Sequence, residues 1–373
     1  MSAITLASLR AQIYRCPIET PVVTSFGTMH DRPMLLVRAE GRDGTVGWGE
    51  AWCNFPSFGA GHRARIVNRI LAPLAEGRAF ADPPAAFTAL TDATAVMALQ
   101  SGEPGPFAQG IAGVDIALWD LAARRDGQPL WRLLGGTSPD VPVYASGLSP
   151  GDPQRLAASC QDEGFRAFKL KLGFGAERDR ANLAALRRTL GDGAALMADV
   201  NQGWTLDEAQ HAASWLAPFG LDWLEEPIRA DRPWSEWQAL APAGIPLAAG
   251  ENLAGEAFAP AIASGALAVL QPDAGKWGGI SGTMPLAQGI VAAGLRYCPH
   301  WLGGGVGLLA SAHLLAAAGG PGLLEVDANP NPLRSLTCGP LARIQDGRAT
   351  LSDEPGLGPA PDETALRRYQ AAA

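Results

Sequence analysis

The sequence predicts an α/β protein in which a closed barrel of parallel strands follows a smaller α+β unit. Three observations support this fold class. The chain has 373 residues, more than one hydrophobic core usually organises. From about residue 141, short β-type runs alternate with helical segments at intervals of roughly 23 to 28 residues, the length of one strand–loop–helix–loop unit. Neither GxGxxG nor a Walker-type loop is present, which argues against an open doubly wound sheet.

The first unit begins with alternating apolar and polar residues over 3–50, interrupted by a GRDG turn. This pattern predicts a small antiparallel sheet. Helical spacing follows, and we expect helices around 62–74, 83–91 and 109–125.

Eight β-type runs follow, which is the number expected for a closed parallel barrel. The runs are 141–147, 167–173, 195–201, 221–227, 246–252, 269–275, 296–301 and 323–328. We therefore predict a first domain at 1–125, a barrel at 126–328, and a C-terminal segment at 329–373 that packs onto the first domain.

Composition excludes several other classes of protein. A net charge of −8 without any Lys/Arg run argues against nucleic-acid binding. The five cysteines are widely spaced without a CxxC pair, so we expect no disulfide framework or zinc knuckle, and a cytoplasmic location. The N-terminal residues do not resemble a signal peptide. The apolar stretch 314–324 contains three glycines and a proline and is too short to span a membrane.

Ionisable residues stand at the ends of seven consecutive predicted strands, the second to the eighth. In a parallel barrel, catalytic groups sit at these carboxyl ends. The residues are Lys169 and Lys171, Asp199, Glu225 and Glu226, Glu251, Asp273, His300, and Glu325.

Lys169 and Lys171 are two residues apart, so both side chains point to the same side of their strand. Burying two ammonium groups is costly unless anions lie nearby. Asp199, Glu225 and Glu251 on the next three strands supply such anions, and three carboxylates suit Mg²⁺. The alternative is that each carboxylate caps a helix or pairs with a lysine, which explains one of them more readily than all three.

Several stretches together resemble the enolase superfamily, in its mandelate racemase / muconate lactonizing branch. They are IAGVDIALWDLAARRDGQPLWRLLGG, GFRAFKLKLG, ADVNQGW, WLEEP, GEN and QPDAGKWGG, in the order and spacing of a barrel. The resemblance implies a modified (β/α)₇β TIM barrel, an N-terminal α+β capping domain joined by the C-terminal segment, and a symmetric homo-oligomer.

The resemblance also implies a metal site and a first base. Asp199, Glu225 and Glu251 would bind Mg²⁺, Lys171 would be the base on one face of a carboxylate substrate, and Lys169 would touch the substrate carboxylate. Removing the α-proton of a carboxylate creates a dianionic enediolate, whose charge a metal ion stabilises. Enolase-type sites with a Lys or His base and Mg²⁺ are a known pattern. We expect Lys169 and the metal to lower the pKa of Lys171. Glu226 should face the opposite way and lie outside the direct metal ligands.

On the other face, Asp273 and His300 resemble the Asp/His dyad of the mandelate racemase subgroup. Glu325 resembles the acid that hydrogen-bonds the substrate carboxylate. Lys276 matches a lysine that is the second base in other branches; because His300 and Asp273 are both present, the dyad is favoured and Lys276 receives a structural, electrostatic or substrate-selecting role.

Other residues are weaker candidates. His30 in a predicted loop of the first domain, and Trp52, Asn54 and Phe55 in AWCNFPSFG, either select the substrate or are packed turns. His313 lies on an apolar helical stretch and is expected to be a packed or capping histidine.

Proton abstraction in this family has several outcomes. Dehydration of a hydroxylated acid such as a sugar acid is the preferred prediction, by analogy with the family, and racemisation or epimerisation is the alternative. Cycloisomerisation is disfavoured because those members usually pair Lys with Lys. A non-catalytic binding protein would be expected to lose a ligand or base, and none is lost. A Schiff-base aldolase would need no carboxylate cluster and would be inhibited by borohydride, whereas this prediction calls for inhibition by EDTA.

Overall fold

The computed structural model describes residues 3–24, 27–241 and 244–372. The N-terminal part forms an antiparallel sheet with the C-terminal strand β14 (Gln370–Ala371), in the order β14-β1-β2-β3, with β4 (Ala79–Phe80) also paired to β1. Its long strands are β1 (Ile4–Thr24), β2 (Gly27–Gly41) and β3 (Val46–Ala51). This confirms the sheet that the alternating pattern predicts.

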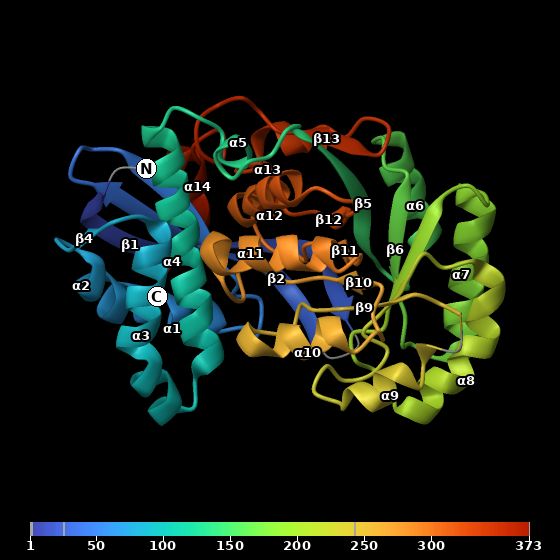
Figure 1. The fold of residues 1–373 in the computed structure, drawn as a ribbon. Helices are drawn as coiled ribbons and strands as arrows, with labels where there is room; N and C mark the ends of the chain where they lie inside the picture. The colour runs from blue at the N-terminus through green and yellow to red at the C-terminus, as the bar shows by residue number, and fades with distance from the viewer. Residues whose placement is uncertain (1–2, 25–26, 242–243, 373) are drawn as a thin grey trace.

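Helices cover one face of this sheet (Figure 1). They are α1 (Gly59–Ile66), the π-helical η1 (Val67–Leu71), α2 (Ala72–Ala75), α3 (Pro83–Ser101) and α4 (Pro104–Arg125). The helix predicted at 83–91 extends to Ser101, because no stop signal occurs before Gly102, which has a left-handed φ of 68°. Helix α4 packs against β3 and against the barrel helix α11 (Gly279–Ala292).

All eight predicted barrel runs contain strands, joined side by side in the order β11-β10-β9-β8-β7-β6-β5-β12. The strands are β5 (Asp140–Leu148), β6 (Ala167–Lys171), β7 (Ala195–Asp199), β8 (Leu224–Glu225), β9 (Leu247–Ala249), β10 (Val269–Leu270), β11 (Arg296–Tyr297) and β12 (Leu324–Asp327). The first and last strands of this order also meet. The backbone N–H of Leu323, next to β12, donates to Sγ of Cys298, next to β11, over 3.3 Å.

Helices alternate with these strands, as the (β/α)₇β expectation requires. They are α6 (Pro153–Asp162), α7 (Ala176–Leu190), α8 (Leu206–Leu216), α9 (Trp234–Gln238), α10 (Phe258–Ala263), α11 (Gly279–Ala292) and α12 (Gly305–Ala318). The fold is therefore a (β/α)₇β barrel with an N-terminal capping domain, and the predicted fold class is confirmed.

The C-terminal segment contacts both parts. It contains α13 (Pro332–Ser335), β13 (Arg348–Thr350), α14 (Glu363–Leu366) and β14 (Gln370–Ala371). Strand β13 pairs with β5, and β14 pairs with β1.

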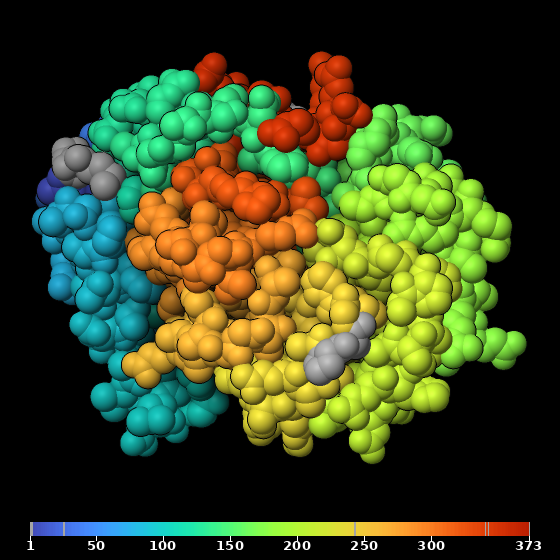
Figure 2. Space-filling view, turned by 45° about the vertical axis from the view of Figure 1, so that its right-hand side comes forward, coloured from blue at the N-terminus to red at the C-terminus, as the bar shows by residue number. Residues whose placement is uncertain are grey.

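The cap helices α3 and α4, teal in Figure 2, lie against the orange barrel helix α11. The domain boundaries themselves stay a prediction.

An apolar cluster fills the inside of the barrel and supports the polar layer above it. Its fully buried members include Tyr144, Met197, Trp223 and Cys298. All five cysteines are buried free thiols, as expected from their spacing. Among the described residues, no helix combines the length and apolarity needed to cross a bilayer.

Candidate active site

Lys169 lies at the centre of the polar layer and is completely buried. Its Nζ is 2.6 Å from Glu225 Oε1 and 2.8 Å from Glu325 Oε1. Burial alone would lower the pKa of Lys169, but these carboxylates outweigh it and raise the pKa well above its usual value. Lys169 is therefore a fixed positive charge.

Lys171, two residues further along β6, contacts the next strand. Its Nζ is 2.5 Å from Asp199 Oδ2 and 2.8 Å from Asn201 Oδ1. Burial and Lys169 act to lower the pKa of Lys171, but Asp199 and Glu225 prevail and raise it. The protein's own groups thus do not produce the lowered pKa that the sequence predicts, because the direct contact with Asp199 outweighs the effect of Lys169.

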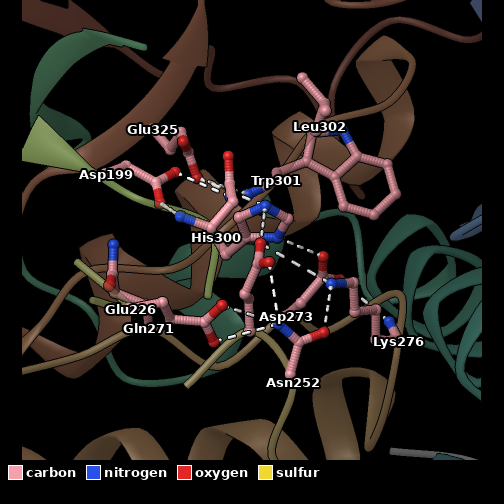
Figure 3. A network of polar contacts seen from close by, with 12 residues as sticks. Asp199, Glu226, Asn252, Gln271, Asp273, Lys276, His300, Trp301, Leu302 and Glu325 are labelled. Atoms are coloured by element: carbon pink, nitrogen blue, oxygen red, sulfur yellow. Dashed lines mark hydrogen bonds and ion pairs between the residues drawn. The ribbon is translucent and has the colours of Figure 1, made fainter. Parts of the chain in front are cut away.

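His300 and Asp273 come together on the other side of the barrel. His300 Nδ1 is 2.6 Å from Asp273 Oδ2, and its Nε2 is 2.5 Å from Glu251 Oε2 (Figure 3). Burial acts to lower the pKa of His300, but Glu251, Glu325 and the bond to Asp273 raise it to about 10. These contacts favour the charged imidazolium, a form that can serve as an acid.

Glu226 does not face away from the site as period-two geometry predicts. Strand β8 ends at Glu225, and Glu226 has a positive φ of 38°, which breaks the alternation. Its carboxylate is buried and accepts from Asn252 Nδ2 at 2.9 and 3.0 Å, and the same amide donates to Glu251 Oε1 at 3.0 Å (Figure 3). Glu226 and Glu251 are thus neighbours in one network.

The charges of this layer favour a cation. Its described residues provide six carboxylates against four cationic side chains, which leaves two negative charges when all are ionised. The carboxylates are Asp199, Glu225, Glu226, Glu251, Asp273 and Glu325, and the cations are Lys169, Lys171, Lys276 and His300. Burial is the largest influence on Glu225 and raises its pKa to about 7. The neighbouring lysines act to lower this pKa, and the neighbouring carboxylates act to raise it. A divalent cation with oxygen ligands fits this surplus of buried anions.

The three predicted metal ligands each lie against a protein partner. Asp199 contacts Lys171, Glu225 contacts Lys169 and accepts from Gln271 Nε2 at 2.6 Å, and Glu251 contacts His300. Across residues 3–24, 27–241 and 244–372, no three His, Cys, Asp or Glu side chains form a ready-made ligand shell. The ligand set therefore stays a prediction, supported by the chemistry of the donors.

Glu325 is held by three donors. Its carboxylate lies 2.5 Å from Ser146 Oγ, 2.8 Å from Lys169 Nζ and 3.2 Å from the backbone N of Trp301. Burial acts to raise its pKa, but Lys169 and His300 lower it to about 2. This arrangement favours the ionised form of Glu325, and its role as the acid that hydrogen-bonds the substrate carboxylate stays a prediction.

The cap reaches the barrel through the segment that contains Trp52 and Asn54. The backbone N of Trp52 donates to Gly275 O over 3.2 Å, and Asn54 Nδ2 donates to Leu302 O. Lys276 Nζ lies 4.8 Å from the centre of the Trp52 ring and 3.7 Å from Glu251 Oε2.

These contacts place Asn54 and Lys276 at the rim of the site. A cavity of about 440 Å³ opens beside Lys276 and Glu251, between the start of α4 and residues 252–255.

His30 differs from its prediction. It is an exposed residue of strand β2, at an irregularity of the β1–β2 pairing between Met29 and Asp31, and not part of a loop. Ser25 and Phe26 of the same predicted loop lie outside the described residues. His313 is packed as expected: its Nδ1 accepts from the backbone N of Trp131 at 2.8 Å, and burial lowers its pKa to about 3.

Two polar residues of the network were not identified from the sequence. Gln271 is two residues before Asp273, so the period-two rule that selected Lys169 and Lys171 could have found it. Asn252 directly follows the predicted ligand Glu251 in the GEN motif. Asn252 is uncharged, so a search for ionisable residues at strand ends does not find it.

Known families match nearly the whole chain. The profile described as "Enolase C-terminal domain-like" matches residues 153–365, and that of the mandelate racemase / muconate lactonizing enzyme N-terminal domain matches residues 9–135. The chain belongs to the mandelate racemase / muconate lactonizing enzyme family of the enolase superfamily. The predicted family is confirmed.

Solved structures of this family are similar over their full length. A mandelate racemase/muconate lactonizing enzyme from Bordetella bronchiseptica RB50 is 56% identical, with a TM-score of 0.94 over 99% of this chain and 100% of its own. A racemase from Streptomyces coelicolor A3(2), solved with bound magnesium, is 30% identical, with a TM-score of 0.86 over 98% and 100% of the two chains.

Curated relatives in the family have different reactions. D-galactarolactone cycloisomerase from Agrobacterium fabrum is 30% identical over 98% of both chains. 3,6-anhydro-alpha-L-galactonate cycloisomerase from Streptomyces coelicolor is 33% identical over 94% of this chain and 95% of its own. Arabinonate dehydratase from Saccharolobus solfataricus is 28% identical over 88% of each. The protein is thus an enzyme of the superfamily, and the names of its relatives leave the reaction class open.

Proposed function

We propose that this enzyme is a magnesium-dependent hydro-lyase that removes the α-proton of a hydroxylated acid, such as a sugar acid, and expels the β-hydroxyl group as water. One observation carries the proposal: His300, paired with Asp273, stands across the barrel from Lys171. Strand β6, which carries Lys171, and β11, which precedes His300, are separated by β5 and β12 on one side and by four strands on the other. A substrate between them would meet an acid–base group on each face.

Asp199, Glu225 and Glu251 are the residues proposed to hold magnesium. The surplus of two carboxylates over cationic side chains in their layer supports this, as does the magnesium bound by the Streptomyces racemase. When bound, the ion would supply electrostatic stabilisation of the enediolate charge. Glu226 lies against the same network through Asn252 and would orient Glu251.

The remaining chemistry belongs to the side chains. Lys169 would bind the substrate carboxylate, and the ionised Glu325 would hold Lys169 in place. Lys171, once deprotonated, would accept the α-proton at Nζ. His300 would donate the proton on Nε2 to the departing β-oxygen, so that water leaves and the resulting enol tautomerises to a 2-keto acid. Asp273 would hold the ring through Nδ1 and favour its charged form.

Two alternatives use the same residues. Racemisation or epimerisation would pass the α-proton from one of the two groups to the other without elimination, and the Streptomyces racemase supports it. Cycloisomerisation is supported by the names of two relatives, although the sequence disfavours it through the Lys/His pairing. Homo-oligomeric assembly and a cytoplasmic location stay predictions of the sequence.

A substrate screen tests the proposal. Sugar acids, their lactones and substituted amino acids would be incubated with enzyme and Mg²⁺ in D₂O, with keto acid and α-hydrogen exchange followed by colorimetry and NMR. Keto acid formation that Lys171→Gln and His300→Asn abolish is the expected result. Exchange without keto acid would establish epimerisation in its place. Absence of both signals on every acid, with magnesium binding shown by calorimetry, would refute α-proton chemistry.

A further inference from the structure

Glu50 is a buried carboxylate that the proposed chemistry does not use. It lies on cap strand β3 and is only 1% exposed, although it carries a charge when ionised. Its Oε1 accepts from the backbone N of Gly304 at 2.5 Å, and its Oε2 accepts from the backbone N of Gly307 at 2.9 Å. Both amides belong to the start of barrel helix α12, 254 and 257 residues away in the sequence. Such amides have no partner inside their own helix.

The segment that Glu50 holds leads directly from His300. Trp301 follows His300, and its indole Nε1 donates to Gly304 O over 2.8 Å, while its backbone N donates to Glu325 Oε2 over 3.2 Å. Glu50 therefore fixes the far end of a loop, residues 301–304, whose near end carries the acid–base histidine.

The glycines of this loop show how closely Glu50 fits. A Cβ added to Gly304 would lie 2.3 Å from Met34 Sδ and 2.8 Å from Glu50 Oε1, and one added to Gly303 would lie 2.4 Å from the Trp301 ring and 3.1 Å from Glu50 Oε1. Both positions therefore leave no room for a side chain beside Glu50, Met34 and the Trp301 ring. The glycine-rich run after Trp301 and the carboxylate of the cap are complementary in shape.

A second cap side chain holds the same loop, since Asn54 donates to Leu302 O. Glu50 differs from it because a carboxylate accepts two backbone bonds at once, one on the loop and one inside the helix.

We propose that Glu50 is a positioning residue for His300, through which the docked cap sets the place of the acid–base group on that face of the substrate. The inference rests on the proposed function for its catalytic consequence only. The position of the His300 ring can be tested without a substrate.

Glu50→Gln is the informative variant. The amide has nearly the same shape, but its nitrogen is a donor, so it can accept from only one of the two backbone N–H groups. Asp120→Asn is the matched control. Asp120 is a buried cap carboxylate that also accepts from two backbone amides, those of Trp48 at 2.8 Å and Leu357 at 2.6 Å, and neither belongs to the His300 loop.

The first readout is the NMR signal of the His300 ring. The chain has only five histidines, so the signal can be assigned with His300→Asn. Glu50→Gln is expected to shift or split this signal, and Asp120→Asn to leave it in place. An unchanged signal in Glu50→Gln, or equal changes in both variants, would overturn the proposal. This result stands whether or not the enzyme acts on any acid tested.

The second readout uses an acid for which the wild type exchanges the α-hydrogen in D₂O, supplied as each stereoisomer. Glu50→Gln should slow exchange on the His300 face by about 10²-fold, the effect of a small misplacement of a catalytic group, and leave exchange on the Lys171 face unchanged. Equal losses on both faces would mean a general structural role and overturn the proposal. If the wild type exchanges nothing, the proposed function fails and the NMR result still decides the role of Glu50.

Discussion

A buried ion pair between the cap and the barrel should be worth several kcal/mol. Arg32 on β2 and Asp327 on β12 are both 2% exposed and form a direct bond between their side chains. Removing one partner of a buried pair leaves an uncompensated charge and costs about 3–5 kcal/mol.

The structure also predicts which substitution costs more. In Arg32→Met, Asp327 would keep the bonds from the backbone N and Nδ2 of Asn329, at 3.0 and 2.8 Å, with Arg334 Nη1 at 3.8 Å. In Asp327→Asn, the Arg32 guanidinium loses its charged partner, and its Nη1 is already buried without one. Asp327→Asn should therefore lie near 5 kcal/mol and Arg32→Met near 3 kcal/mol, both within the order of magnitude for broken buried pairs.

Guanidinium unfolding followed by circular dichroism and tryptophan fluorescence measures these differences. For a chain of this length the losses correspond to a fall in Tm of roughly 4–6 °C. The half-buried pair Arg15–Asp31 in the same hairpin is the control, and Arg15→Met should cost no more than about 1 kcal/mol because solvent reaches both side chains. The double variant Arg32→Met/Asp327→Asn should cost less than the sum of the single changes. Additive losses, or an Asp327→Asn loss no larger than that of Arg15→Met, would refute the reasoning.

Three further predictions concern the site and its surroundings. His300 has a pKa raised to about 10, so its contribution to stability is complete below about pH 6.5 and is lost as pH rises toward 10. The difference in unfolding free energy between EDTA-treated wild type and His300→Asn should therefore shrink over that range. A difference that grows with pH would contradict the assignment. EDTA should abolish activity and Mg²⁺ restore it, and Glu251→Gln should raise the Mg²⁺ concentration for half-maximal activity by at least about tenfold in a titration. Unchanged activation would remove Glu251 from the ligand set. His313→Leu should leave the buried N–H of Trp131 without an acceptor and cost about 1–3 kcal/mol in chemical unfolding, with no change in the pH profile of activity.

The sequence determined the architecture and most members of the site. Barrel strands repeat at a regular interval, and side chains alternate along each strand, so Lys169 and Lys171 could be assigned to the inside of the barrel from local spacing alone. Because parallel strands end at one rim, the ionisable residues at their ends could be expected to gather there, and the Asp273–His300 pair does so.

Only the tertiary structure decided how these groups are paired and charged. Glu226 joins the network through a positive φ that no alternation rule contains, and the raised pKa of His300 depends on carboxylates at the ends of three other strands. The contact of Glu50 with α12 exists only once the cap has docked on the barrel. Local periodicity fixes the direction in which a side chain points, whereas its partner, and with it its charge, comes from segments that meet only when the barrel closes and the cap packs against it.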